Sequence, residues 1–313
     1  MKITDTACGI LFKSDGKLLL CQRRKPPYAG YWEFPGGKIE RFELPEMAVR
    51  REIHEEIAVL PRVILPWQTC IHRDSHAMVS LHVFRILSWE GRPQPVEKQP
   101  MGWFSPFALP EPGLPANRII LQTLRLPPYC AFTAIAEYGL NIFLERLHRA
   151  LQKGLKLVIF REKELPLSQL KSAYAAVARL VWSNKAKLLL SSFHLDSLPT
   201  TNTDPGPMGI HYTSSDLQKL GQRPGGLVSA SCHNASDLNH ALSLGLDFAV
   251  LSPVEKTTSH PEALPLGWVH FSALVKNLPL PVYALGGLSW NDLHWAMMHG
   301  AYGVAFRGAA WRL

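Results

Sequence analysis

The sequence predicts two domains, a mixed-sheet α+β domain followed by an α/β domain built as a parallel (β/α)8 barrel. Its 313 residues, 47% hydrophobic and 19% charged, are enough for two separate cores. Strand and helix patterns are mixed in the first part and alternate regularly in the second. Between them a helical pattern ends at Leu126-Pro127-Pro128, and a proline pair stops helices and is typical of domain boundaries. We therefore expect domains over residues 1–126 and 127–313.

The first domain begins with two apolar runs, residues 7–12 and 18–21, whose connecting turn predicts a β-hairpin. Residues 44–57 have the spacing of a helix, whereas residues 78–86 and 102–104 alternate as strands do. This mixture favours a mixed sheet with helices packed on it.

Eight short apolar runs follow the boundary, and helical patterns separate most of them. The runs are residues 130–135, 155–160, 187–190, 208–211, 226–231, 248–251, 281–285 and 303–306. Strands that alternate with helices predict a parallel sheet, and eight of them favour a barrel of the TIM type. An open doubly wound sheet is the alternative architecture.

Composition narrows the class of protein. The five cysteines are widely spread without a CxxC pair, which argues against a disulfide framework and a zinc site, so we expect them to be reduced and mostly buried. The net charge of +8 comes from scattered Lys and Arg residues, which suits a polyphosphate substrate better than stable nucleic-acid binding. Neither a membrane-length apolar stretch nor a signal-peptide pattern is present, so we expect a cytoplasmic protein without a membrane partner.

Three glutamates in the predicted helix over residues 44–57 form the most informative pattern. On a helix, Glu52, Glu55 and Glu56 fall at about 0°, 300° and 40°, so their carboxylates share one face. Glu52 and Glu56 would repel each other by about 0.2 to 0.5 kcal/mol. A hard divalent cation removes that repulsion, and magnesium binds carboxylate oxygens together with substrate phosphates. The sequence therefore predicts a Mg²⁺ site, with Mn²⁺ as the alternative ion.

The surroundings of these glutamates support the same interpretation. Gly36 and Gly37 let the backbone turn tightly and approach a substrate. Arg51 can pair with a carboxylate such as Glu43 and fix the loop against the helix. A solvated acidic helix face is the bland alternative, and it requires all of these residues to coincide by chance.

This segment resembles the Nudix box, G-x5-E-x7-R-E-U-x-E-E-x-G-U, where U is aliphatic. The residues that fall on it are Gly37, Glu43, Arg51, Glu52, Ile53, Glu55, Glu56 and Val59. Ala58 replaces the glycine that ends the helix in a left-handed conformation, which costs roughly 1 to 2 kcal/mol, and we expect activity to survive this. The resemblance implies an α/β/α sandwich and a catalytic role for Arg51 and the three glutamates. The metal ligands it implies are Gly37, Glu52, Glu55, Glu56 and Glu97; which glutamate is the general base stays open.

Over about residues 3–126 the chain resembles the MutT-type 8-oxo-dGTP diphosphatases. Three segments carry this resemblance: residues 32–40, residues 89–103 and Leu114-Pro115-Ala116-Asn117. It implies Mg²⁺-dependent hydrolysis of 8-oxo-dGTP to 8-oxo-dGMP and pyrophosphate, which removes an oxidised nucleotide before DNA synthesis. The implied substrate-binding residues are Arg23, Phe34, Gly36, Gly37, Lys38 and Asn117.

The residue types alone leave other roles open. Asn117 stands where a helix N-cap belongs, Phe34 suits a core, and Arg23 suits the surface. Glu97 also fits an exposed loop charge.

Residues from about 130 to 313 resemble thiamine phosphate synthase at residues 157–165, 209–217, 251–254 and 283–287. The resemblance implies a barrel that binds a phosphorylated small ligand. Its phosphate site would be formed by Gly286, Gly287, Arg307 and Gly308.

Part of that family's catalytic set is replaced in this chain. A metal-binding aspartate corresponds to Ser192, a lysine to His260 and a substrate-binding glutamine to Ile159. Arg161, Lys163 and Asp216 remain, yet one carboxylate cannot hold a metal as two would. We therefore expect a degenerate barrel without synthase activity.

Two further functions stay open at this point. The Nudix domain could hydrolyse thiamine-type diphosphates, because the fused barrel resembles an enzyme that handles related ligands. Alternatively, the barrel could act as a sensor of a phosphorylated ligand.

Overall fold

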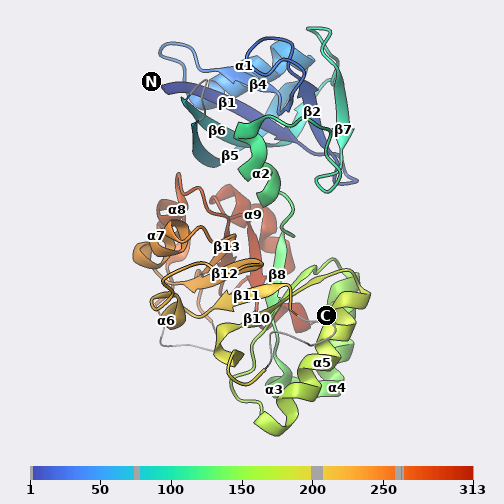
Figure 1. The fold of residues 1–313 in the computed structure, drawn as a ribbon, viewed down its shortest axis with the longest axis vertical. Helices are drawn as coiled ribbons and strands as arrows, with labels where there is room; N and C mark the ends of the chain where they lie inside the picture. The colour runs from blue at the N-terminus through green and yellow to red at the C-terminus, as the bar shows by residue number, and fades with distance from the viewer. Residues whose placement is uncertain (1–2, 74–77, 199–206, 258–261, 263, 313) are drawn as a thin grey trace. The chain divides into compact units, whose positions relative to one another are not determined.

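The computed structural model describes residues 3–73, 78–198, 207–257, 262 and 264–312 (Figure 1). Two compact units are formed, one largely by Met1–Leu126 and the other by Pro127–Lys276 with Leu280–Leu313. His260 lies outside the described residues.

Among its described residues, the first unit contains two sheets and two α-helices. Its elements are β1 (Ile3–Leu11), β2 (Leu18–Gln22), β3 (Trp32–Glu33), β4 (Gly36–Lys38), α1 (Pro45–Ile57), β5 (Leu60–Arg73), β6 (Met78–Glu90), β7 (Met101–Phe104), η1 (Pro115–Asn117) and α2 (Arg118–Thr123). The larger sheet has the order β4-β1-β6-β5, in which β1 and β6 are parallel and the other pairs antiparallel. The smaller sheet is antiparallel with the order β3-β2-β7. The predicted mixed sheet is confirmed.

Alternation along β1 separates two cores on the two faces of the larger sheet. Ala7 and Leu11 pack in a cluster with the buried face of α1, which includes Ile53. Cys8 belongs to a second cluster with Ile120 of α2. Helices therefore cover both faces, as the α/β/α arrangement requires.

Strand β5 is absent from the sequence-based expectation, which gives no strand between residues 58 and 77. Pro61 and Pro66 interrupt the pattern there, and the register with β6 shifts next to both prolines. Proline is tolerated because β5 pairs on one side only, so a missing N–H breaks no bond to a further strand.

The second unit is a closed barrel of eight parallel strands, in the order β10-β11-β12-β13-β14-β15-β8-β9. Its elements are β8 (Tyr129–Phe132), α3 (Ile135–Tyr138), α4 (Leu140–Gln152), β9 (Leu157–Phe160), α5 (Leu167–Ser183), β10 (Lys187–Ser191), η2 (Ser192–His194), β11 (Gly209–Tyr212), α6 (Ser214–Leu217), β12 (Leu227–Cys232), α7 (Ala235–Ser243), β13 (Phe248–Leu251), α8 (Gly267–Val275), β14 (Val282–Leu285), η3 (Trp290–Asp292), α9 (Leu293–Met298), β15 (Gly303–Phe306) and η4 (Ala309–Trp311). The TIM-type prediction is confirmed, and the open sheet is excluded because β15 pairs with β8.

Contacts distant in sequence hold this closure together. The fully buried Trp311 donates its indole N–H to Phe132 O at 3.1 Å and packs edge-on against Phe143. These contacts fasten the end of the barrel to its first strand and first long helix.

All five cysteines are free and buried, as the sequence predicts. Among the helices that the structure describes, none combines the length and the apolar character that crossing a membrane requires.

Candidate active site

Helix α1 presents the three glutamates. Its buried face consists of Ala48, Val49, Ile53 and Ile57, so the glutamates lie on the remaining faces. The helix ends at Ala58, whose φ of 55° and ψ of 33° are left-handed, and the Ala58 N–H donates to His54 O at 3.0 Å. Alanine therefore ends the helix in the conformation that the Nudix glycine would adopt.

Arg51 is the centre of the hydrogen-bond network on this helix. Its Nε and Nη2 donate to the two carboxylate oxygens of Glu43 at 2.9 and 2.8 Å, and Nη2 also donates to Lys38 O at 3.1 Å. Its Nη1 donates to Glu52 at 2.9 Å and to Glu55 at 3.3 Å. The pairing with Glu43 therefore fastens the preceding loop to α1, as the motif predicts.

The glycine pair lies directly against the glutamates. The Gly36 N–H donates to Glu56 Oε2 at 2.9 Å, and its φ of 150° brings it against β1, where a Cβ would overlap the backbone of Ala7. A Cβ on Gly37 would overlap the carboxylate of Glu52. Lack of space therefore requires glycine at Gly36, whereas a side chain at Gly37 would displace the Glu52 carboxylate.

Glu56 is the most strongly perturbed of the three glutamates. Its pKa is raised to about 8, chiefly by burial and also by the charges of Glu33, Glu52 and Glu97, while the hydrogen bond from Gly36 lowers it. Burial also raises the pKa of Glu52, whereas Arg51 lowers it. The carboxylates of Glu33, Glu52 and Glu97 therefore act together on Glu56, and a cation bound here would favour its charged form.

The loop after β6 brings Glu97 to the end of α1. Val96 N–H and the Gln99 side-chain amide both donate to Glu56 O, at 3.1 and 2.9 Å. Glu97 is about half exposed, and its carboxylate lies 4.0 Å from Lys25 Nζ. These loop contacts therefore hold Glu97 close enough for its charge to raise the pKa of Glu56, although Glu97 does not lie on α1.

Glu33 is a site residue that sequence reasoning missed. It lies on β3 opposite Cys21, is largely buried, and acts electrostatically on Glu56. Burial raises its pKa, whereas an ion pair of 3.1 Å with Arg23 lowers it. The available signal was a carboxylate flanked by two aromatic residues, Trp32 and Phe34.

A divalent cation fits this donor set chemically but not the side-chain positions as they stand. Among the residues that the structure describes, no three acidic, histidine or cysteine side chains converge tightly enough to enclose an ion. Glu52 and Glu55 are held by Arg51, and Glu56 by Gly36. Rotation of these carboxylates toward each other, with Glu97, would supply the oxygen ligands that magnesium prefers.

The other predicted substrate residues are dispersed. Arg23 donates to Glu33 and to Pro27 O at 2.9 Å, so it is engaged inside its own unit. Phe34 is 2% exposed within the cluster below α2, which agrees with the core alternative. The Lys38 side chain is exposed, and only its carbonyl joins the Arg51 network.

Asn117 lies at the end of η1 with only 2% of its surface exposed. It directly precedes α2 (Arg118–Thr123), while Leu114 is the N-cap of η1. Its side-chain Nδ2 is buried and has no hydrogen-bond partner among the described residues. An unsatisfied buried donor costs about 1 to 3 kcal/mol, so Asn117 is suited to bind a polar group of a ligand.

The predicted phosphate residues of the barrel separate into two groups. Gly286 and Gly287, with φ of 115° and 71°, pack against the segment after β13, where Glu255 N–H donates to Gly286 O at 3.1 Å. Arg307, directly after β15, lies close enough to Arg161 to lower its pKa. Gly308, next to it, has space for a Cβ 3.5 Å from Arg312.

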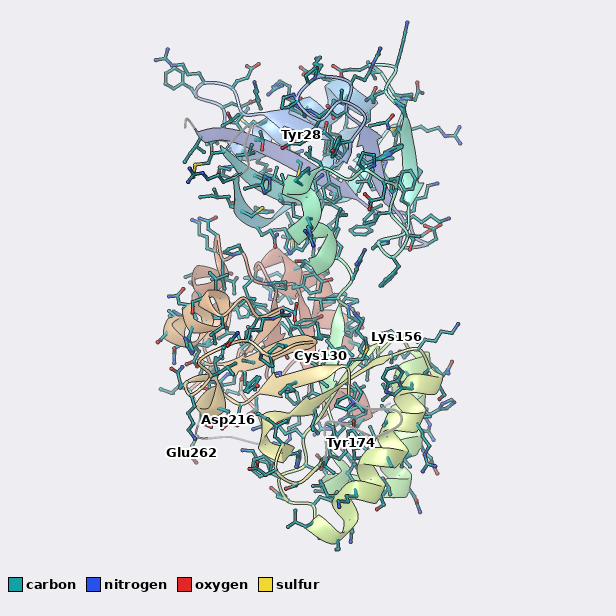
Figure 2. All side chains as sticks on the ribbon, viewed as in Figure 1. Tyr28, Cys130, Lys156, Tyr174, Asp216 and Glu262 are labelled. Atoms are coloured by element: carbon teal, nitrogen blue, oxygen red, sulfur yellow. The ribbon has the colours of Figure 1, made fainter. Side chains whose placement is uncertain are left out.

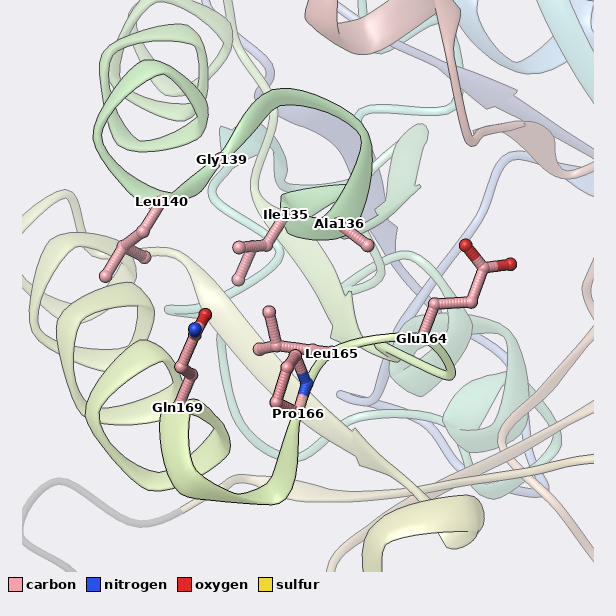
Figure 3. Close-up of a pocket in the computed structure, with 8 residues that line it drawn as sticks. All are labelled: Ile135, Ala136, Gly139, Leu140, Glu164, Leu165, Pro166 and Gln169. Carbon is pink, nitrogen blue, oxygen red and sulfur yellow. The ribbon is translucent and has the colours of Figure 1, made fainter.

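A pocket of about 290 Å³ opens between the segments that follow β8 and β9 (Figure 3). Its lining comes from within residues 135–140 and 164–169, and its polar side chains are Glu164 and Gln169. A carboxylate without a cation beside it does not suit a phosphate, so this pocket is not the predicted phosphate site.

Comparison with known proteins identifies both units. A model of the NUDIX domain matches residues 2–124, and a model of thiamine monophosphate synthase matches residues 131–310. The chain is 32% identical over 127 residues to the 8-oxo-dGTP diphosphatase of Escherichia coli (strain K12), covering 40% of this chain and 98% of that protein. It is 34% identical over 187 residues to the putative thiamine-phosphate synthase 2 of Aquifex aeolicus (strain VF5), covering 58% and 96%. The chain belongs to the NUDIX and thiamine monophosphate synthase families.

The Nudix unit is also 34% identical over 124 residues to the CTP pyrophosphohydrolase of E. coli (strain K12), which covers 39% of this chain and 91% of that protein. It is a Nudix hydrolase of the MutT type, joined to a barrel of the synthase family. Nudix enzymes generally use a divalent metal, and both families imply substrates of the nucleotide type.

Proposed function

We propose that the Nudix unit hydrolyses 8-oxo-dGTP to 8-oxo-dGMP and pyrophosphate with Mg²⁺, and so removes an oxidised nucleotide from the pool. The observation that carries the choice of base is Asn117. Its buried amide nitrogen has no partner among the described residues, although a buried donor without a partner destabilises the fold. A ligand that accepts from this amide removes that cost.

The chemistry of the base decides which ligand fits. Guanine presents two acceptors, N7 and O6, on one edge. When the Asn117 amide donates from Nδ2 to O6, its Oδ1 faces N7, and two acceptors repel each other. In 8-oxoguanine N7 carries a hydrogen, so Asn117 can donate to O6 through Nδ2 and accept from N7–H through Oδ1. The arrangement therefore favours the oxidised base over guanine.

The phosphate end of the substrate would meet the glutamates of α1. Glu52, Glu55, Glu56 and Glu97 are the residues that would hold magnesium. When bound, the ion would neutralise phosphate charge and lower the pKa of the attacking water. Arg51 holds Glu43 and thereby fixes the loop, while Gly36 and Gly37 keep space beside Glu56 and Glu52.

The 8-oxo-dGTP and CTP enzymes resemble the Nudix unit to similar degrees, so sequence identity does not choose the base of the substrate. The buried, unpartnered amide of Asn117 supports 8-oxo-dGTP over dGTP. The five free, buried cysteines support a reducing compartment, so we place the reaction in the cytoplasm.

The test is release of pyrophosphate from 8-oxo-dGTP, CTP and thiamine diphosphate, with magnesium and with EDTA. Glu56→Gln should lower turnover by about 100-fold or more. The matched control Glu46→Gln removes an exposed carboxylate from the first turn of the same helix and should leave turnover unchanged. Equal turnover by the two variants would exclude the glutamates as the active site. Turnover of thiamine diphosphate alone would show that the Nudix unit hydrolyses a thiamine-type diphosphate instead of 8-oxo-dGTP.

A further inference from the structure

Gln68 is a buried amide on the face of the larger sheet that α2 covers. It lies on β5 opposite Val83 of β6, and Cys70 follows two residues further on the same side of the strand. Val83, Cys70 and Ile120 of α2 belong to one hydrophobic cluster. Side chains of the strands and of the helix fill the layer between them (Figure 2). Gln68, only 6% exposed, therefore lies in this layer.

Asn117 faces the same layer from the side of the helix. η1 continues directly into α2, and Arg118 at the junction has helical backbone angles, so Asn117 and Ile120 lie one turn apart on one face. Ile120 is fully buried in the cluster that contains Cys70. Two amides therefore line one layer, Gln68 from the sheet and Asn117 from the helical segment.

Both amides keep a buried donor for a ligand. The Nε2 of Gln68 and the Nδ2 of Asn117 have no hydrogen-bond partner in the part of the chain that the structure describes. An unsatisfied buried donor destabilises a fold, and a ligand that accepts from it removes this cost. Arg85, a buried polar residue of β6 on the same face, instead lies with its guanidinium 4.5 Å from the centre of the Trp67 ring. Contacts within the fold therefore accommodate Arg85 but leave the Gln68 donor unused.

The backbone of β5 is irregular directly before Gln68. The register with β6 shifts between Pro66 and Gln68, and such a β-bulge redirects the side chains beside it and is frequent next to ligand sites. Trp67, inside the bulge, also packs against the cluster below α2. Two consecutive residues therefore face this layer, although consecutive residues of a regular strand face opposite sides.

The edge of 8-oxoguanine offers one acceptor that Asn117 leaves unused. Asn117 would engage O6 and N7–H, and the C8 carbonyl oxygen lies next to N7–H on the same edge. A carbonyl oxygen accepts from an amide N–H. On the basis of the function proposed above, we propose that Gln68 donates through Nε2 to the C8 carbonyl oxygen. Gln68 then recognises the oxygen atom that guanine lacks, whereas Asn117 recognises the hydrogen on N7.

The test compares kcat/KM for 8-oxo-dGTP and for dGTP, measured as pyrophosphate release by the full chain with Mg²⁺. Gln68→Met keeps the length of the side chain but removes its donor. Because one hydrogen bond is lost, kcat/KM for 8-oxo-dGTP should fall by about fivefold or more, while that for dGTP stays unchanged. Gln94→Met removes an exposed amide from the loop after β6 and should behave as wild type does. A role of Gln68 in folding alone would lower both values together, and this result would overturn the proposal.

Titration calorimetry with 8-oxo-dGMP and dGMP in EDTA provides a second readout that needs neither metal nor turnover. Gln68→Met should bind 8-oxo-dGMP about fivefold or more weakly than wild type and dGMP equally well. If Gln68→Met keeps the full preference for the oxidised nucleotide while Asn117→Leu loses it, the role of Gln68 is overturned and the proposed function stands. Wild type without any preference for the oxidised nucleotide would overturn both.

Discussion

Arg51 holds the carboxylate of Glu43 by two nearly equal hydrogen bonds, of 2.9 Å from Nε and 2.8 Å from Nη2. The hydrogen bonds from Arg51 and from Glu40 N–H lower the pKa of Glu43 to about 2. The Arg51–Glu43 pair therefore stabilises the fold fully above about pH 4.5, the pKa of Glu43 in the unfolded chain. This stabilisation is lost as the pH falls toward 2. It joins the loop before α1 to the helix that carries the glutamates.

Replacing Arg51 by lysine should destabilise this junction. Lysine keeps the charge but cannot form two parallel bonds, so we expect Arg51→Lys to lower the free energy of unfolding of the Nudix unit by about 1.5 to 3 kcal/mol. Urea unfolding measures this. Arg62→Lys, which alters an exposed pair with Glu90, is the control and should leave stability nearly unchanged, because solvent screens an exposed ion pair. Similar losses in both variants would contradict a special role for the Arg51 pair.

Ala58→Gly should stabilise the Nudix unit. Alanine in the left-handed conformation costs about 1 to 2 kcal/mol, and glycine removes this at a smaller entropic cost, which leaves a gain of about 0.5 to 1 kcal/mol. The same exchange at Ala175, exposed within α5, should destabilise by about 1 kcal/mol. In thermal unfolding we expect a higher melting temperature for Ala58→Gly and a lower one for Ala175→Gly. Destabilisation by Ala58→Gly would show that the backbone of Ala58 is not left-handed.

Asn117→Leu should separate stability from selectivity. The substitution removes a buried, unpartnered donor, so the free energy of unfolding should rise by about 1 kcal/mol. Selectivity for 8-oxo-dGTP over dGTP should fall by about tenfold or more in steady-state kinetics. Asn117→Asp keeps the shape but replaces the donor with an acceptor, and it should lose the same selectivity. Unchanged selectivity in both variants would exclude Asn117 from base recognition.

His211 should make the stability of the barrel depend on pH. Burial, and then the charge of Arg161, lowers its pKa to about 3, and its ring contacts Ser229 Oγ at 2.8 Å and Ser231 Oγ at 2.9 Å. Between about pH 6.5 and 3 the unfolded chain binds a proton that the folded barrel does not, so stability falls as pH falls, by up to about 1.4 kcal/mol per pH unit.

The comparison with His211→Gln isolates this contribution. Glutamine keeps polar contacts but does not titrate, so the barrel transition of the variant should change less between pH 7 and pH 5 than that of wild type. Parallel pH profiles of the two proteins in thermal unfolding would contradict the lowered pKa.

The glutamates of α1 could be predicted from the sequence because their spacing is local and one helix carries all three. Glu33 could not, because strand pairing between β2 and β3 brings it to Glu56. The engagement of Arg23 with Glu33 likewise depends on that pairing. Local patterns therefore identify the helix that carries the three glutamates and miss the residues that other strands bring to it.

The barrel shows the same limit. Its eight strands are short, continuous apolar runs that the sequence displays directly. The sequence could favour a closed barrel over an open sheet but could not decide between them. The decisive pairing of β15 with β8 joins segments more than 170 residues apart. The convergence of Arg161 and Arg307 follows from that closure, so the charge cluster could not be derived from spacing.

The most direct test of the account is the ratio of kcat/KM for 8-oxo-dGTP to that for dGTP, measured as pyrophosphate release by wild type with Mg²⁺. A pocket in which Asn117 recognises N7–H and O6 predicts a ratio of about 100 or more. A ratio near one, with both nucleotides hydrolysed, would leave the Nudix unit a general pyrophosphohydrolase and contradict the proposed selection of the oxidised base.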